Sequence, residues 1–216
     1  LARDAEYQAI IPLRGKILNC LKESIERIMG NEIILDLVHV IGCGIEPKSR
    51  YIKEMPKFDI DKLNFGKIII CTDADIDGGH IRCLLIAMIY RLMPTLIKEG
   101  YVYIAETPLY TIECNGKKHF AYNAEERDTI LNQLEQSGYS ESKIKIQRSK
   151  GLGENNPEDM AVSTMNPDTR RLVRVDYPQG DDSEFVKLLE TLMGNDLDGR
   201  KQIISDHFDS IEVSID

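Results

Sequence analysis

The sequence predicts an α/β fold in which a parallel sheet is followed by a smaller α+β region. The first observation is a continuous apolar run, "KIIIC" at residues 67–71, which is typical of a strand buried on both faces. The second is the apolar segment 80–100, which is too long for a strand and predicts a buried helix that bends or ends near Pro94. A further strand pattern, "YVYIAETP" at residues 101–108, comes next. Strand, helix and strand in this order imply a right-handed crossover between parallel strands.

Two helices are predicted before the first strand. Residues 19–29 have helical spacing with Asn19 as the expected N-cap, and residues 31–41 form a second helical pattern that ends near Gly42. The stretch from there to the first strand contains two prolines and is expected to be a loop.

The chain changes character after the parallel unit. Two alternating runs flank the pair Asn115-Gly116, which is a strong hairpin signal. A polar helix is predicted near residues 124–136, then a strand at 143–149 and a loop, and finally short helices around a strand at 170–177. The predicted parts are an α/β core at 1–110, a hairpin and helix connection at 111–145, and a C-terminal region at 146–216.

The composition is ordinary for a globular chain, with 42% hydrophobic and 29% charged residues among 216. No apolar run approaches the roughly 20 residues of a membrane span, and the N-terminus has no signal-peptide pattern, so we expect a cytoplasmic protein without membrane association. Five scattered cysteines without C-x-x-C spacing predict reduced thiols. The net charge of −9 lies mainly in residues 181–216, which hold ten acids and three bases. Charge alone therefore neither favours nor excludes nucleic acid.

The segment "CTDADIDGGH" places Asp73, Asp75 and Asp77 at alternate positions directly after the first predicted strand. Its lettering suggests an EF-hand calcium loop, but the twelfth position is Leu84 instead of the required glutamate, and a strand precedes it where a helix is needed. The EF-hand interpretation is therefore excluded.

A magnesium site explains the same segment better. If the chain stays extended past Cys71, the three carboxylates point to one side and repel one another unless a cation lies between them. Carboxylate oxygens suit Mg²⁺, and the carboxyl end of a parallel strand is where open α/β sheets bind ligands. Gly78 and Gly79 are expected to let the backbone turn into the helix, with His80 facing the same crevice. The chemistry that fits is metal-assisted phosphoryl transfer or phosphodiester cleavage, and the alternative is a solvated acidic turn.

At this point a family resemblance emerges. "TDADIDGGHIR" after an apolar strand resembles the acidic motif of TOPRIM domains, in particular that of the B subunits of bacterial type IIA topoisomerases, DNA gyrase or topoisomerase IV. Further stretches are similar to the same family in the same order: "QAIIPLRGKILN" (8–19), "GYVYIAETPLY" (100–110), "KGLGENNPEDM" (150–160) and "TMNPDTRRLVRV" (164–175).

The resemblance implies a Rossmann-like TOPRIM sheet and an ATP-dependent DNA topoisomerase activity, an isomerase. It implies that Asp73 and Asp75 bind the catalytic Mg²⁺, with Mn²⁺ or Ca²⁺ as substitutes, and that Asp77 joins Asp75 at a second metal position. The implied DNA contacts are Arg14 and Lys16, with Lys150 a weaker candidate of the same kind. Lys16 taken alone could begin a solvated helix, and the resemblance favours the DNA contact. His80 could contact DNA or orient a carboxylate, and it could equally cap the helix.

The implied partners are double-stranded DNA and a topoisomerase A subunit, in an A2B2 heterotetramer whose A subunit supplies the nucleophilic tyrosine. The family's Glu-Gly-Asp-Ser segment and first sheet strand are expected upstream of residue 1, as is the ATPase region. We therefore expect a fragment that lacks a catalytic glutamate, does not bind ATP and is inactive alone.

Two alternatives belong to other classes. One is a TOPRIM nuclease or primase, which would not be expected to carry "PLRGKILN" and "TMNPDTRR" as well. The other is a non-catalytic interaction domain whose acids hold no metal. The sequence does not choose between gyrase and topoisomerase IV.

Overall fold

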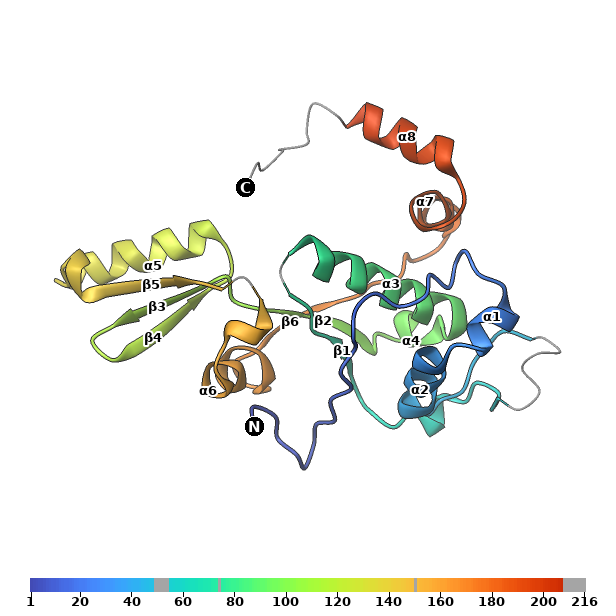
Figure 1. The fold of residues 1–216 in the computed structure, drawn as a ribbon, viewed down its shortest axis with the longest axis horizontal. Coiled ribbons are helices and arrows are strands. Elements are labelled where there is room, and N and C mark those ends of the chain that lie inside the picture. Colours follow the sequence, from blue (N-terminus) through green and yellow to red (C-terminus); the bar gives the residue numbers. More distant parts are fainter. Residues whose placement is uncertain (49–54, 74, 150, 208–216) are drawn as a thin grey trace. The chain divides into compact units, whose positions relative to one another are not determined.

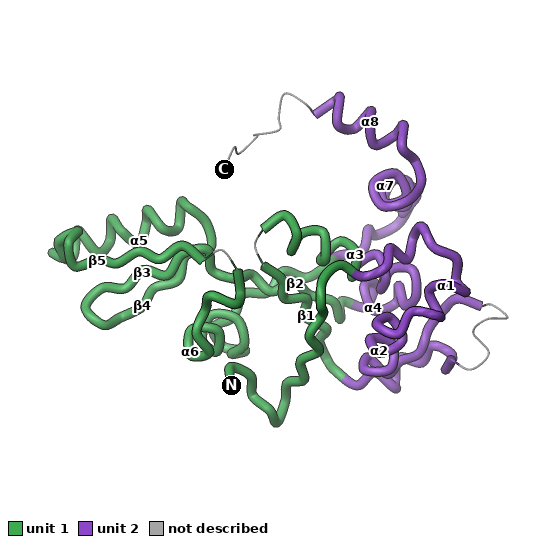
Figure 2. Tube along the Cα trace, viewed as in Figure 1, with its two compact units in different colours: residues 1–16, 65–85, 100–175 green, residues 17–64, 86–99, 176–216 purple. Residues whose placement is uncertain are grey.

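A computed structural model describes residues 1–48, 55–73, 75–149 and 151–207. The chain forms two compact units, neither of which is a continuous stretch (Figure 2). The first consists of residues 1–16, 65–85 and 100–175, and the second consists of residues 17–64, 86–99 and 176–216. The mixed α/β structure expected from the sequence is confirmed. The three sequence segments drawn at 1–110, 111–145 and 146–216 stay a prediction, because compactness divides the chain differently.

One of the two sheets in the first unit contains the two parallel strands that the sequence predicts. Strand β1 (Ile68–Ile70) pairs in parallel with β2 (Val102–Glu106), with Ile69 opposite Tyr103. A third strand, β6 (Arg171–Arg174), pairs antiparallel with β2, so a strand expected in the C-terminal region completes a mixed sheet (Figure 1). Burial of β1 is weaker than expected, because Ile70 is buried while the two preceding isoleucines are half-buried.

Helix α3 (Ile76–Leu92) begins earlier than expected, within the acidic motif. Asp75 stands directly before it, accepts a hydrogen bond from the Gly78 amide through Oδ1 at 2.7 Å, and accepts another from the Gly79 amide through its carbonyl. The expectation that the chain stays extended through Asp77 is therefore wrong, because Asp75 caps the helix and draws the next residues into its first turn. The expected helix end near Pro94 is confirmed, since α4 (Thr95–Lys98) starts after that proline.

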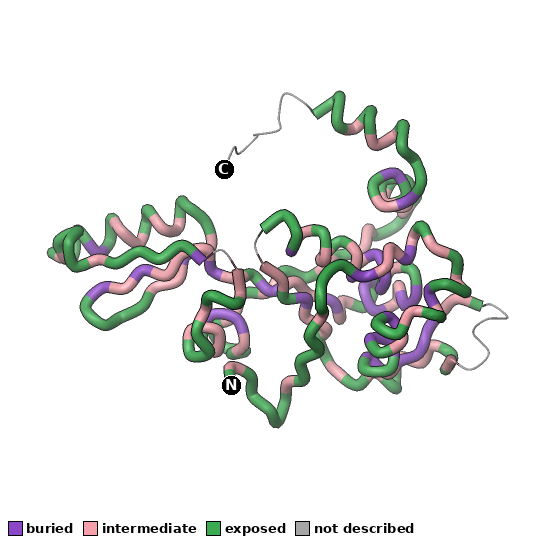
Figure 3. Tube along the Cα trace, in the orientation of Figure 1, coloured by how far each residue is buried: buried purple, intermediate pink, exposed green. Residues whose placement is uncertain are grey.

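Residues 109–149 form a three-stranded antiparallel sheet with one helix, which we call the hairpin subdomain (Figure 1). Asn115 and Gly116 have φ values of 50° and 73°, the left-handed conformation of a two-residue hairpin turn. The hairpin subdomain has a buried core (Figure 3) that consists of Ile112, Cys114, Ala121 and Leu134. The elements are β3 (Tyr110–Cys114), β4 (Lys117–Ala121), α5 (Ala124–Gln136), a short 3-10 helix (Glu141–Lys143) and β5 (Ile144–Arg148). The predicted hairpin, helix and strand are confirmed.

The expected loop after β5 contains short helical turns. They are a 3-10 turn (Leu152–Glu154), α6 (Pro157–Met160) and a π-helical turn (Ala161–Met165). The hairpin subdomain is joined to this region and to β6 by side chains: the Tyr122 hydroxyl donates to the Ser163 carbonyl, and the Arg171 guanidinium lies 3.9 Å from the Tyr122 ring centroid.

In the described residues of the second unit, the regular secondary structure is helical, apart from one isolated β-bridge. The first expected helix is shorter than predicted, because α1 (Ile25–Met29) is capped by Ser24 and not by Asn19. The Asn19 side chain instead accepts from the Leu21 amide and donates to the Met193 carbonyl. The second helix, α2 (Glu32–Ile41), ends at Gly42 as predicted. The remaining elements are a 3-10 turn (Ile60–Lys62), α7 (Ser183–Met193) and α8 (Leu197–Asp206).

All five cysteines are free; Cys20, Cys43 and Cys114 are buried, and Cys71 and Cys83 are exposed. Within the described ranges, every helix falls short of the length and apolar character that crossing a membrane requires.

Candidate metal site at the acidic motif

Asp73 follows β1 and is held by a loop that is distant in the sequence. Its Oδ1 accepts a hydrogen bond from the backbone amide of Leu152 at 2.7 Å, across 79 residues. Gly151 lies against the same carboxylate, since a Cβ atom at this position would be 3.2 Å from both Cγ and Oδ2 of Asp73. The side chain is thus fixed by contact with residues 151–152.

Gly78 packs against the backbone of Asp73. It is buried, and a Cβ atom at this position would overlap the Asp73 carbonyl oxygen. The neighbouring Gly79 faces open space. The sequence predicted a tight turn at both glycines, but neither has a positive φ; Gly78 is needed because two backbone segments approach closely.

Asp77 is exposed, with 74% of its side chain accessible. Its Oδ1 lies 2.7 Å from Lys16 Nζ and 3.6 Å from His80 Nδ1. The Lys16 ammonium, and more weakly His80, hold the pKa of the Asp77 carboxyl below its usual range. Asp77 and its two basic neighbours therefore form a small charged cluster at the surface.

The three carboxylates thus have three different sets of partners. Among the described residues there is no group of three or more His, Cys, Asp and Glu side chains placed to hold a metal ion. The assumption of one shared side fails because Asp77 lies in the first turn of α3. Metal binding by these acids stays a prediction.

Asp73 and Asp75 supply carboxylate oxygens, which have the right chemistry for Mg²⁺. Among the described residues, the backbone N–H groups of Leu152 and Gly78 donate to Oδ1 of these two carboxylates, respectively. Mg²⁺ commonly binds through one or two carboxylates together with water and substrate phosphates. Two such carboxylates on either side of residue 74 are compatible with this pattern.

The four residues predicted to contact DNA have different surroundings. Arg14 is exposed, Lys16 and His80 lie beside Asp77, and Lys150 lies outside the described residues. Sequence reasoning missed the role of Gly151 and Leu152. The two glycines of "KGLGE" were the available signal, because a glycine often marks a close approach.

The sequence matches two protein families and is similar to several known proteins. Residues 1–107 match the family described as the Toprim domain, and residues 141–205 match the one described as "DNA gyrase B subunit, carboxyl terminus". The chain is 44% identical over 206 residues to the B subunit of DNA gyrase from Thermotoga maritima, covering 95% of this chain and 30% of the relative. It is 42% identical over 213 residues to the gyrase B subunit of Thermus thermophilus (99% and 32%). It is 39% identical over 217 residues to the B subunit of DNA topoisomerase 4 from Haemophilus influenzae (99% and 32%).

The first part of the chain is accordingly a Toprim domain. The chain as a whole is similar to the B subunits of DNA gyrase and of topoisomerase IV, and it spans about a third of the length of these relatives.

Proposed function

We propose that this chain is the Mg²⁺-binding module for DNA cleavage and religation in an ATP-dependent type II DNA topoisomerase. The observation that carries the proposal is the position of Asp73 and Asp75, between the carboxyl end of β1 and the start of α3. Ligands of α/β sheets bind at this edge. The names of the relatives, B subunits of DNA gyrase and of DNA topoisomerase 4, support the same activity.

In this function the chain supplies ligands and positive charge. Asp73 and Asp75 would hold Mg²⁺, which when bound stabilises the negative charge that develops on the phosphodiester. Asp77 would hold a second position, Arg14 and Lys16 would contact DNA phosphates, and His80 lies beside Asp77 where it can do the same. The nucleophilic tyrosine would come from an A subunit in an A2B2 assembly in the cytoplasm. ATP would bind to another part of the B subunit.

Plasmid cleavage tests this proposal. The complete B subunit that contains this chain is combined with its A subunit and supercoiled DNA, with and without Mg²⁺. We expect Asp75→Ala to reduce metal-dependent cleavage by about 100-fold or more, because a ligand is lost. Asp61→Ala, at an exposed position in the second unit, is the matched control and should cleave normally. Undiminished cleavage by Asp75→Ala would contradict the proposal.

A non-catalytic interaction domain is the second candidate, and the separate partners of the three carboxylates are the observation that favours it. Titrating Mn²⁺ into the 216-residue chain and its Asp73→Asn variant separates the two. The proposed site predicts binding that the substitution weakens, whereas an interaction domain predicts none in either.

A further inference from the structure

We propose that the turn formed by Gly151 and Leu152 is a positioning element of the metal site, which orients the carboxylate of Asp73. This inference rests on the proposed function, since it concerns how one of the proposed metal ligands is held. The groups that act are the backbone amide of Leu152 and the Cα of Gly151, which carries no side chain, so no charged residue is involved. The turn belongs to the stretch that matches the gyrase B carboxyl-terminal family, whereas Asp73 belongs to the Toprim match.

The Leu152 amide donates a hydrogen bond to Oδ1 of the Asp73 carboxylate at 2.7 Å, a distance within the range of charge-assisted hydrogen bonds. A hydrogen bond to Oδ1 restrains the rotation of the carboxylate, so that Oδ2 points away from the Leu152 amide. Groups that orient metal ligands in this way typically alter metal affinity by about 10- to 100-fold when they are removed.

Little space is left around the carboxylate. A Cβ atom on Gly151 would lie 3.2–3.3 Å from Cγ and both oxygens of Asp73, so any larger residue would push the carboxylate aside. A Cβ atom on Gly78 would overlap the Asp73 backbone. Asp73 is therefore closely packed at its side chain by Gly151 and at its backbone by Gly78.

The turn is itself held in place by hydrogen bonds to Ser149. The Ser149 hydroxyl is hydrogen-bonded to the Gly151 carbonyl (3.1 Å) and to Asn155 Oδ1 (3.2 Å). Ser149 is buried, and its amide donates to the Leu109 carbonyl at 2.9 Å. Because Ser149 directly follows β5, the hairpin subdomain fixes the turn and the turn fixes Asp73.

Two matched pairs of variants test the inference in the full 216-residue chain. Gly151→Ala adds a methyl group against Asp73, whereas Gly153→Ala adds one in open space. Leu152→Pro removes the amide donor at the first position of a 3-10 turn, where proline is tolerated and where the preceding Gly151 is extended (φ −167°, ψ 166°). Leu152→Ala shortens the same side chain but keeps the donor.

The measurement is Mn²⁺ titration followed by paramagnetic broadening of backbone amide signals in NMR spectra, which detects weak binding residue by residue. We expect Gly151→Ala and Leu152→Pro to weaken binding near residues 73–80 by about tenfold or more, and both controls to bind like wild type. The amide spectra also report whether each variant is folded, and the two pairs perturb the turn independently.

Asp73→Asn keeps the two possible failures apart. If Asp73→Asn weakens binding while each test variant binds like its control, the positioning role is wrong and the metal site stands. If Asp73→Asn binds Mn²⁺ like wild type, the proposed metal site itself is wrong.

Discussion

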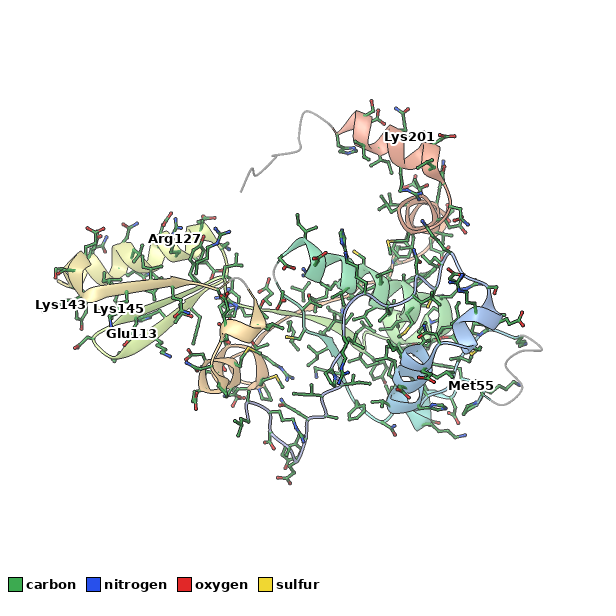
Figure 4. All side chains as sticks on the ribbon, in the orientation of Figure 1. Met55, Glu113, Arg127, Lys143, Lys145 and Lys201 are labelled. Carbon is green, nitrogen blue, oxygen red and sulfur yellow. The ribbon has the colours of Figure 1, made fainter. Side chains whose placement is uncertain are left out.

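The acidic motif and the hairpin subdomain hold their residues in place in different ways. In the acidic motif, Asp73 is held by contacts with Gly151 and Leu152, and Asp77 is held by an ion pair with Lys16. The hairpin subdomain has its own buried core. In the register of its sheet, Glu113 is opposite a lysine on each neighbouring strand, and it lies with Lys143 and Lys145 toward one end of the sheet (Figure 4). A substitution in the hairpin core should therefore change stability most, whereas one in the motif should cost less stability and also change the geometry of the site.

The largest expected effect is in the hairpin core. Ile112 is fully buried, so Ile112→Ala should lower the free energy of unfolding by about 2–5 kcal/mol. Ile146 is opposite Ile112 on β5 but is 49% exposed, and Ile146→Ala should cost about 1 kcal/mol. Urea unfolding followed by circular dichroism measures both. Equal losses would mean that this core does not have the packing described.

The next effect is at the motif. Gly78→Ala places a methyl group against the Asp73 carbonyl oxygen, and we expect a loss of about 1–3 kcal/mol because the start of α3 must shift. Gly79→Ala enters open space in the same helix turn and should be neutral or stabilise by up to about 1 kcal/mol. The same urea experiment compares them, and similar stabilities would contradict the close approach.

This contrast also explains which features could be predicted from the sequence. The hairpin was predictable because Asn115 and Gly116 carry the left-handed turn locally, and α5 because Asn123 caps it three residues from its partner Glu126. The hydrogen bond from Leu152 to Asp73 could not be predicted, because its donor is a backbone amide whose position depends on folding across 79 residues. Asn19 illustrates the same limit: its side chain can cap a helix, but a distant carbonyl, that of Met193, binds it instead.

A smaller, pH-dependent effect is expected where the hairpin subdomain meets β6. Arg171 lies 2.7 Å from Glu126 and lowers the pKa of that carboxyl. Because the folded pKa is below the unfolded one, this stabilisation is present above about pH 4.5 and is lost as the pH falls through the folded value. Glu126→Gln should cost about 0.5–1 kcal/mol at pH 7, and this cost should diminish as the pH falls through the folded pKa. Glu125→Gln, in the same helix turn, should show a smaller pH dependence in urea unfolding.

The smallest effect concerns Lys16 and Asp77, both of which are largely exposed. Lys16→Met removes the nearest cation, so the pKa of Asp77 should rise toward its usual value. Carboxyl NMR titration measures that pKa directly. High salt should produce part of the same rise in wild type and little change in the variant, because screening weakens exposed pairs. A pKa of Asp77 that is the same in both proteins at low salt would show that Lys16 is not its partner in solution, and the motif would then lose its link to the "PLRGK" segment.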